Sequence, residues 1–204
     1  MISELRFYYG TMASGKTAIL LNQNFIWRTK KKRNVFLLKS ALDTRSGIAT
    51  ISSRNGDSFE ADAIINKVVI IIPLLRELGF GNGKNPDIVL IDECQFLSSA
   101  QIEELREVVS IHNIPVYCYG LLTDANTKSF EGSQRLFEIA DRRLELEAYC
   151  ECCDEKAVVS ARVDEQGNVI KPNSQVDIGG DEKYKPMCFK CWLLRGGKLW
   201  KSLH

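Results

Sequence analysis

Residues 10–17, Gly-Thr-Met-Ala-Ser-Gly-Lys-Thr, have the residue types and spacing that hold the phosphates of a nucleotide. They fit the pattern G-x-x-x-x-G-K-[ST], in which Gly10 and Gly15 let the backbone curl until its N–H groups face phosphate oxygens. Lys16 adds a positive charge near the outer phosphates, and the Thr17 hydroxyl is a hard oxygen ligand for Mg²⁺. A helix that follows brings the positive end of its dipole to the same place. We call residues 10–17 the phosphate loop.

The acidic pair Asp92-Glu93 closes the unbroken apolar run Ile88–Ile91. An apolar strand that ends in two acidic residues resembles a Walker B strand, whose first carboxylate holds Mg²⁺ opposite the hydroxyl of the phosphate loop. Because successive side chains of an extended segment alternate, we expect only one of the two carboxylates in the metal shell. The Walker B pattern gives that place to Asp92 and leaves Glu93 facing the acceptor. Phe96 follows closely and is placed to offer an aromatic face to a ring.

Asp43 and Arg45 follow another apolar run, at 34–38. This is the carboxyl end of an expected strand, and ligand sites of open parallel sheets lie at such ends. Both residues are therefore candidates for the metal and phosphate shell, with a surface ion pair as the alternative.

Four of the seven cysteines form two Cys-x-x-Cys pairs, at Cys150, Cys153, Cys188 and Cys191. This pattern fits a tetrahedral Zn²⁺ site with four thiolates, and a reducing compartment favours metal over disulfides. Such a site has no open coordination position, so we expect a structural metal. Unrelated buried cysteines are one alternative, and Cys152 as a replacement ligand is another. Cys94 and Cys118 lie beside apolar strands and are expected in the core.

The segment between the cysteine pairs contains a hairpin candidate at 163–169 and a glycine pair close to Tyr184. A glycine-containing segment clamped by metal suits a flexible lid. Backbone groups near Gly179 are placed to recognise a planar heterocycle, with Tyr184 stacking on it.

The elements that must position these residues alternate between strand and helix. Strands are predicted at 5–9, 34–38, 68–72, 88–91 and 115–119, with an exposed edge strand at 144–148. Helices are predicted from Ala18 to Ile26, at 73–78, from Ala100 to Ser110 after a cap at Ser98 or Ser99, and after Gly132. A turn is predicted at Asn55-Gly56. This alternation is typical of a parallel α/β sheet.

The chain of 204 residues is long enough for one good-sized domain and a small appendage. Its net charge of +1 gives no general electrostatic case for a nucleic-acid partner, and the basic run 30–33 is expected to be the solvated end of the first helix. No apolar run is long enough to span a bilayer and no signal peptide is visible, so we expect a cytoplasmic protein without a membrane partner.

Taken in chain order, these motifs resemble the thymidine kinase family of bacteria and the vertebrate cytosol. The resemblance is carried by residues 10–17, Asp43-Thr44-Arg45, Ser53-Arg54, Asp92-Glu93-Cys94-Gln95-Phe96, Tyr119-Gly120-Leu121, residues 178–184 and both cysteine pairs. It covers nearly the whole chain. It implies an α/β fold with a P-loop (RecA-like) parallel sheet core at 1–148 and a small C-terminal zinc-ribbon-like lasso domain at 149–204.

The resemblance implies a kinase that transfers the γ-phosphoryl group of ATP to the 5′-hydroxyl of thymidine, as in thymidine salvage. Glu93 would be the general base that takes the hydroxyl proton. The phosphates of ATP would be bound by Gly10, Thr11, Met12, Ala13, Ser14, Gly15, Lys16, Thr17 and Arg45, and Mg²⁺ by Thr17, Asp43 and Asp92. Thymidine would contact Met12, Phe96, Leu121, Val176, Asp177, Ile178, Gly179, Gly180 and Tyr184. The family is usually a homotetramer inhibited by thymidine triphosphate.

The chain departs from the family pattern after the strand that ends at Gly120. Ala125 stands where many members have an aromatic residue, and Leu122 where a polar residue is common. The resemblance therefore implies the reaction more firmly than the preference for thymidine over deoxyuridine.

Two other classes of protein share parts of the pattern. A nucleic-acid-dependent ATPase would also use Lys16, Asp92 and Glu93 but needs a basic groove, and a zinc-ribbon adaptor has no need of a phosphate loop.

Overall fold

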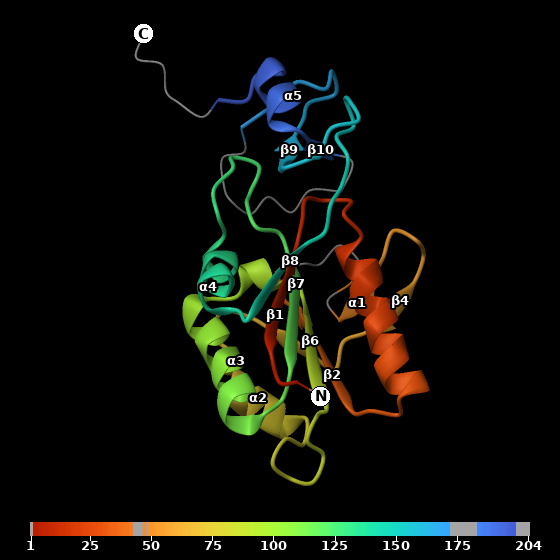
Figure 1. The fold of residues 1–204 in the computed structure, drawn as a ribbon, viewed down its shortest axis with the longest axis vertical. Helices are drawn as coiled ribbons and strands as arrows, with labels where there is room; N and C mark the ends of the chain where they lie inside the picture. The colour runs from red at the N-terminus through yellow and green to blue at the C-terminus, as the bar shows by residue number, and fades with distance from the viewer. Residues whose placement is uncertain (1, 43–46, 48, 172–182, 199–204) are drawn as a thin grey trace.

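The computed structural model describes residues 2–42, 47, 49–171 and 183–198. Its centre is a six-stranded sheet in the order β5-β2-β6-β7-β1-β8 (Figure 1). Each neighbouring pair in this sheet is parallel, so all the carboxyl ends of its strands meet at one edge. The strands are β1 (Leu5–Tyr9), β2 (Val35–Ser40), β5 (Ala63–Ile65), β6 (Ile88–Asp92), β7 (Val116–Gly120) and β8 (Arg142–Glu145).

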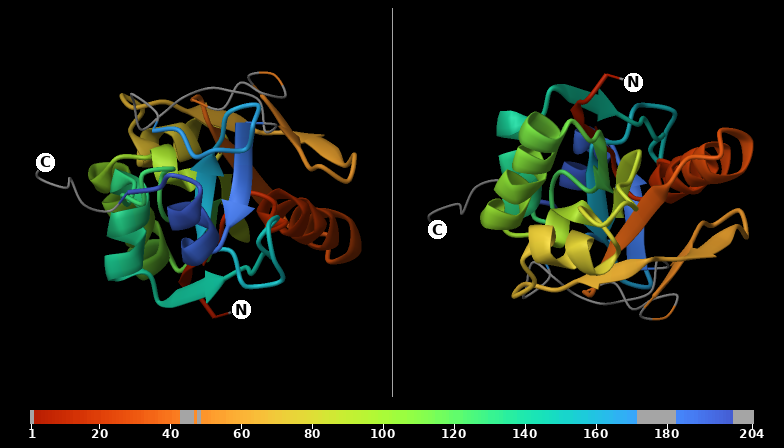
Figure 2. Two further views of the ribbon diagram at one scale, coloured as in Figure 1. Left: turned by 90° about the horizontal axis from the view of Figure 1, so that it is seen from above. Right: turned by 90° about the horizontal axis from the view of Figure 1, so that it is seen from below.

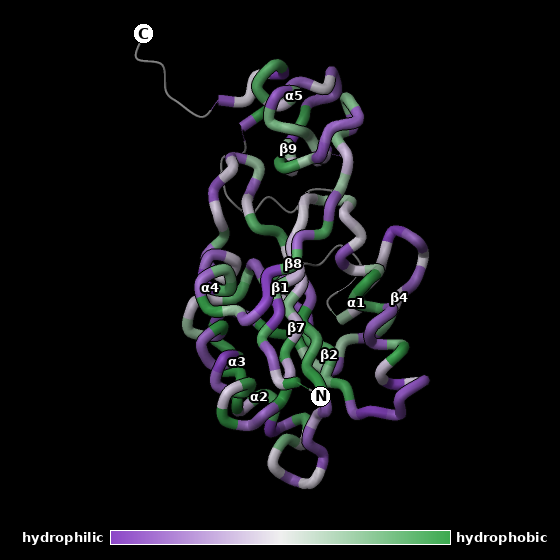
Figure 3. The backbone as a smooth tube through the Cα atoms, in the orientation of Figure 1, coloured by the Kyte–Doolittle hydropathy of each residue, from purple (hydrophilic) through white to green (hydrophobic). Residues whose placement is uncertain are grey.

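Helices cover both faces of this sheet (Figures 1 and 2). One face carries α1 (Lys16–Phe25), which continues into a π-helical turn, η1 (Ile26–Lys30); the other carries α2 (Ile71–Glu77), α3 (Ser99–His112) and α4 (Glu131–Ile139). Along β6, Ile88 and Leu90 pack on the α1 side, while Val89 and Ile91 pack on the opposite side. Burial on both faces explains the continuous apolar runs at 35–38 in β2 and 88–91 in β6. Figure 3 shows the hydrophobic, green tube at β2.

The start of α3 is fixed by its own sequence. The Ser98 side chain accepts a hydrogen bond from the Gln101 N–H at 3.3 Å, and the Gln101 side chain accepts one from the Ser98 N–H at 3.0 Å. This reciprocal capping box confirms Ser98, rather than Ser99, as the cap. The prediction of a core-facing stripe on this helix is also confirmed, because Ile102, Leu105, Val108 and Val109 are buried.

The strand predicted at 68–72 is wrong. Val68 is 85% exposed and Ile70 is 60% exposed, and the chain enters α2 at Ile71. Pro73 is tolerated there because the first turn of a helix does not use its N–H groups. A short apolar run does not distinguish strand from helix, and the strand that pairs with β2 on this side is the shorter β5. The predicted edge strand exists as β8, but it covers 142–145 rather than 144–148.

Two antiparallel hairpins lie outside the main sheet. The first joins β3 (Thr50–Ser52) to β4 (Ser58–Glu60), and its turn contains Gly56 at a φ of 92°, which confirms the predicted turn. The second pairs β9 (Val159–Arg162) with β10 (Tyr184–Met187) and is followed by α5 (Phe189–Leu194). This second hairpin and α5 share a hydrophobic cluster and lie beyond the carboxyl edge of the sheet (Figures 1 and 2). Val163 bridges to Val169 as predicted.

Within the described ranges, no helix has both the length and the hydrophobicity needed to cross a bilayer.

Candidate active site and metal centre

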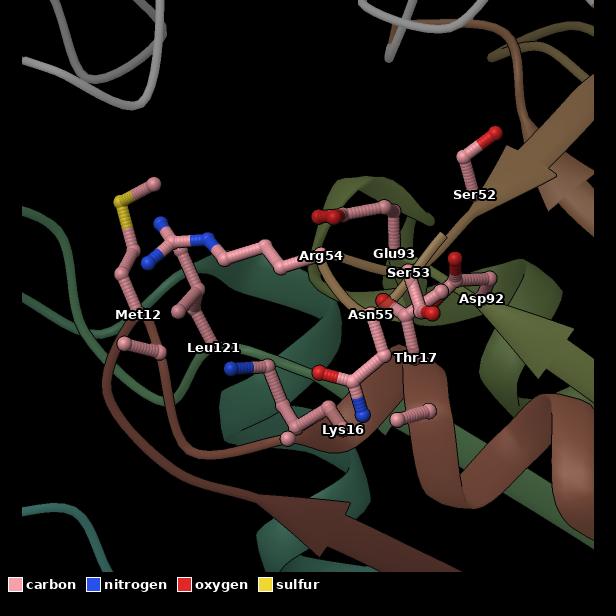
Figure 4. Close-up of a pocket in the computed structure, with 13 residues that line it drawn as sticks. Met12, Lys16, Thr17, Ser52, Ser53, Arg54, Asn55, Asp92, Glu93 and Leu121 are labelled. Atoms are coloured by element: carbon pink, nitrogen blue, oxygen red, sulfur yellow. The ribbon is translucent and has the colours of Figure 1, made fainter. Parts of the chain in front are cut away.

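A pocket of about 260 Å³ opens at the carboxyl edge of the sheet (Figure 4). Its walls come from the phosphate loop and the start of α1, from the β3–β4 turn, and from the ends of β6 and β7. It is lined by Met12, Ala13, Gly15, Lys16, Thr17, Ala18, Ser52, Ser53, Arg54, Asn55, Asp92, Glu93 and Leu121. The structure therefore brings together the two sequence motifs that were expected to meet.

The glycines of the phosphate loop are needed for its shape. Gly15 has a φ of 79°, which side-chain-bearing residues rarely adopt, and a Cβ on Gly10 would lie 2.3 Å from the carbonyl oxygen of Leu146. The Lys16 ammonium donates hydrogen bonds to the carbonyl oxygens of Thr11 at 2.7 Å and Gly10 at 3.2 Å. The lysine thus lies across the loop, with its charge at the place where phosphate oxygens are expected.

The two acidic residues at the end of β6 point in different directions, but not for the reason given by strand alternation. Asp92 is the last residue of β6 and is 4% exposed, whereas Glu93 leaves the strand with φ 54° and ψ 40°. This left-handed conformation is uncommon outside glycine and turns the Glu93 carboxylate away from the strand. Figure 4 shows Asp92 beside Thr17 and Glu93 aimed toward the side of the pocket where Met12 and Leu121 lie.

Gln95 holds the Glu93 carboxylate in place, a role that the sequence did not reveal. Its side-chain amide donates to Glu93 Oε2, and its Oε1 accepts from the backbone N–H of Leu121 at 3.1 Å. Gln95 is 2% exposed, and a Cβ on Gly120 would lie 2.5 Å from its Oε1. Glycine at 120 therefore makes room for the side chain that links the ends of β6 and β7. The signal in the sequence was an amide side chain two residues after Glu93.

The β3–β4 turn contributes four pocket residues, and none of them was assigned a role from the sequence. Ser52, at the end of β3, and Ser53, Arg54 and Asn55, in the turn, line the pocket. Figure 4 shows Asn55 beside Thr17 and the Ser52 side chain pointing away from the phosphate loop. Only the turn itself was predictable, because Asn-Gly is strong turn chemistry, whereas the side of the sheet to which the turn folds is set by tertiary contacts.

The C-terminal module, by which we mean the β9–β10 hairpin and α5, contacts the phosphate loop directly. The backbone N–H of Met12 donates to the Ser160 hydroxyl on β9 at 2.9 Å, and Ser160 is 4% exposed. Tyr184 lies on the neighbouring strand β10, where it pairs with Arg162.

Two aromatic residues predicted to contact the nucleoside, Tyr184 and Phe96, are not among the described residues that line the pocket. Phe96 packs edge-on against Phe130, with ring centroids 5.7 Å apart. Asp43, Arg45 and residues 176–180 lie outside the described residues.

The four cysteines of the two Cys-x-x-Cys pairs converge on one point. The sulfur atoms of Cys150, Cys153, Cys188 and Cys191 all lie within 4.8 Å of one another. Burial acts to raise the pKa of Cys150, but hydrogen bonds from the backbone N–H groups of Cys188 and Cys152 outweigh it and lower that pKa to about 6. The pKa of Cys191 is raised by the neighbouring sulfurs of Cys188 and Cys153, as expected when four thiols crowd together without a cation.

Cys152 does not belong to this cluster. It is exposed, and only its backbone N–H reaches the cluster, through a 3.4 Å contact with the Cys150 sulfur. Cys94 and Cys118 are both fully buried, which confirms the prediction that they are core residues.

Comparisons with known proteins agree with the site. A family model described as thymidine kinase matches residues 3–192. The thymidine kinase of Mannheimia succiniciproducens is 36% identical over 97% of this chain and 99% of its own length. That of Vibrio vulnificus is 40% identical over 92% of this chain and 95% of its own. Among solved structures, the Pif1 helicase of Candida albicans aligns with 71% of this chain and 36% of its own at 16% identity and a TM-score of 0.42, a likeness too weak to carry an argument.

Proposed function

Because this chain belongs to the thymidine kinase family, we propose that the pocket at the carboxyl edge of its sheet is where ATP phosphorylates thymidine. The products are thymidine 5′-monophosphate and ADP, the reaction of thymidine salvage. The observation that carries the assignment to this pocket is the convergence of Lys16 and Thr17 with Asp92 and Glu93 on its walls.

Each polar group in the pocket has a role that fits phosphoryl transfer, which depends mainly on positioning and charge stabilisation. The phosphate loop and Lys16 hold the phosphates of ATP. Thr17 and Asp92, with Asp43, would hold the Mg²⁺ that accompanies ATP and neutralises charge on its β and γ oxygens. Glu93, oriented by Gln95, accepts the proton of the 5′-hydroxyl. Arg45 completes the phosphate shell.

The nucleoside is expected on the side of the pocket where Met12 and Leu121 lie. Phe96, Tyr184 and the backbone of residues 176–180 complete the thymine site in this proposal, with the segment next to Tyr184 acting as a flexible lid. Ala125 replaces a larger side chain of the family pattern, so deoxyuridine remains an alternative substrate.

Tyr184→Ala should raise the KM for thymidine about tenfold or more while changing the KM for ATP little. Stacking of an aromatic side chain on a base contributes about 1–3 kcal/mol, and this contact exists only for the nucleoside. Tyr149→Ala is the matched control, because Tyr149 is 73% exposed and does not line the pocket. Steady-state kinetics with each substrate varied in turn measure both constants. Equal rises in the two would show that Tyr184 does not hold the nucleoside.

The cysteine cluster is proposed to hold a structural Zn²⁺. Four thiolates at mutual contact distance match a closed tetrahedral site, for which the other common occupant is iron in an iron–sulfur cluster. The metal would tie the segment 150–153, which precedes β9, to the start of α5 and so fix the hairpin that carries Ser160 and Tyr184.

Protein purified without added metal should contain about one zinc ion per chain. Cys150→Ser and Cys188→Ser should lose it and melt at a lower temperature, because metal binding contributes free energy of folding. Cys152→Ser should keep it, since the Cys152 thiol lies outside the cluster. Elemental analysis of the four proteins is the measurement. Iron in place of zinc, or no metal in the wild type, would contradict the proposal.

The remaining features of the proposal follow the family. They are a catalytic domain at 1–148, a zinc-binding lasso domain at 149–204, a homotetramer, feedback inhibition by thymidine triphosphate, and a cytoplasmic location. A separate hydrophobic cluster between Cys150 and Trp192 supports the boundary near 149.

The assay that tests the function is ATP turnover with and without thymidine, and with and without DNA. We expect thymidine to be phosphorylated at the same rate with and without DNA. ATP hydrolysis that is equally fast without thymidine would overturn the kinase assignment in favour of an ATPase.

A further inference from the structure

Transfer of the γ-phosphoryl group places negative charge on oxygens that face both the donor and the acceptor. Among the described residues that line the pocket, the side chains that always or usually carry positive charge are Lys16 and Arg54. Lys16 approaches from the phosphate loop, on the donor side. Arg54 approaches from the β3–β4 turn on the opposite wall, and the proposed function gives it no role.

The turn that carries Arg54 is firmly anchored. Ile51 of β3 is 1% exposed and packs in the core under α1. Lys39 of β2 is fully buried, and its ammonium donates to the carbonyl oxygens of Gly47, just before β3, at 3.2 Å and of Thr50, the first residue of β3, at 2.7 Å. The Ser53 N–H closes the turn on the Asp57 carbonyl at 2.8 Å. Arg54 is thus exposed to the pocket from a fixed support.

The direction of Arg54 places its charge near the acceptor side. Figure 4 shows the side chain leaving the turn next to Glu93 and carrying its guanidinium toward Met12 and Leu121. The Ser53 hydroxyl beside it is buried and, within the described part of the chain, has no hydrogen-bond partner. Because the Ser53 oxygen is covered, it is not open to a ligand in this conformation. What the turn presents to whatever fills the pocket is the charge of Arg54.

We propose that Arg54 is a further catalytic residue, which contacts the transferring phosphoryl group from the side opposite Lys16. This inference rests on the proposed function. In the reaction the bond between the β–γ bridging oxygen and the γ-phosphorus breaks, the bond from the thymidine 5′-oxygen to that phosphorus forms, and the hydroxyl proton passes to Glu93. Arg54 stays protonated throughout, and its planar fork matches two phosphoryl oxygens at once.

Arg54→Ala should lower kcat for thymidine phosphorylation about 10²–10³-fold, the cost of removing one group that stabilises transition-state charge. The KM for ATP should change little, since the phosphate loop still holds the donor. Arg54→Lys should recover only part of the loss, because an ammonium does not reproduce the fork, and added guanidinium ion should partly rescue Arg54→Ala. Arg33→Gln is the control: it removes an exposed arginine that pairs with Asp87 away from the pocket.

Binding of ADP with aluminium fluoride and thymidine separates this role from a structural one. The wild type should bind this transition-state mimic far more tightly than ADP alone, and Arg54→Ala should keep the affinity for ADP and lose the gain. If the wild type phosphorylates thymidine and the Arg54→Ala variant has the same kcat, the role of Arg54 is overturned and the proposed function stands. A wild type that does not phosphorylate thymidine would instead overturn the proposed function.

Discussion

Replacing Lys16 with alanine should reduce thymidine phosphorylation by about 10²–10³-fold or more, because the reaction loses a charge that stabilises the transferred phosphoryl group. In the structure the Lys16 ammonium bonds to the carbonyl oxygens of Thr11 and Gly10. It therefore already lies at the mouth of the loop and has only to exchange these carbonyls for phosphate oxygens. No other lysine lines the described pocket, and Arg54 approaches from the opposite wall, so the cation on the side of the phosphate loop is lost.

Two measurements separate the loss of phosphate binding from a collapse of the loop. Titration with a non-hydrolysable Mg²⁺–ATP analogue should show weaker binding by Lys16→Ala, while thermal unfolding without nucleotide should change little. Lys31→Ala is the control, since Lys31 is an exposed lysine just beyond the first helix. Unchanged steady-state kinetics for Lys16→Ala would mean that residues 10–17 do not bind the phosphates.

The parts of the site that the sequence predicted are those encoded by local backbone chemistry. The phosphate loop and the end of β6 combine fixed residue types with a fixed element order, and both line the pocket. The capping box at Ser98 is equally local, because it lies within four consecutive residues. The two Cys-x-x-Cys pairs are each local, but 34 residues separate them; their convergence was predictable because a four-thiolate metal site needs both pairs.

The parts that the sequence missed depend on contacts between distant residues. Ser160 meets Met12 although 148 positions separate them, and nothing local to either residue indicates it. Gln95 reaches the end of β7 only because Gly120 leaves space, which the sheet order decides. Arg54 enters the pocket because Ile51 and Lys39 fix the hairpin on the α1 side. The apolar run 68–72 was misassigned because Ile71 and Leu75 bury one face of a helix, which a short run of aliphatic residues does not reveal.

Glu93→Gln should lower kcat by roughly 10²–10⁴-fold, the usual contribution of a positioned general base. Glutamine keeps the size of the side chain but cannot accept the proton of the 5′-hydroxyl. Affinity for Mg²⁺–ATP should stay close to that of the wild type, because the left-handed backbone at Glu93 turns its side chain away from Asp92 and Thr17. Glu93→Gln keeps a hydrogen-bond acceptor for the Gln95 amide, so the pair should stay in place.

Asp92→Asn is the variant with which Glu93→Gln should be compared. Asp92 is 4% exposed at the end of β6, beside Thr17, and its substitution should weaken binding of Mg²⁺ and of nucleotide together. The two variants differ from the wild type by the same chemical change at adjacent positions. If Glu93→Gln loses turnover while Asp92→Asn loses Mg²⁺-dependent binding of nucleotide, the two carboxylates have different roles, as their directions in the pocket indicate.

The kinetic pattern of Glu93→Gln decides between a base and a residue that only shapes the pocket. Loss of a base lowers kcat and kcat/KM for thymidine together, because the proton transfer occurs in the transition state. Loss of shape instead raises the KM for thymidine and leaves kcat nearly unchanged. Both quantities come from initial rates at saturating ATP, with Mg²⁺–ATP affinity measured separately for each variant. Full turnover of thymidine by Glu93→Gln would remove Glu93 from the reaction and leave proton transfer to solvent or to the phosphoryl group itself.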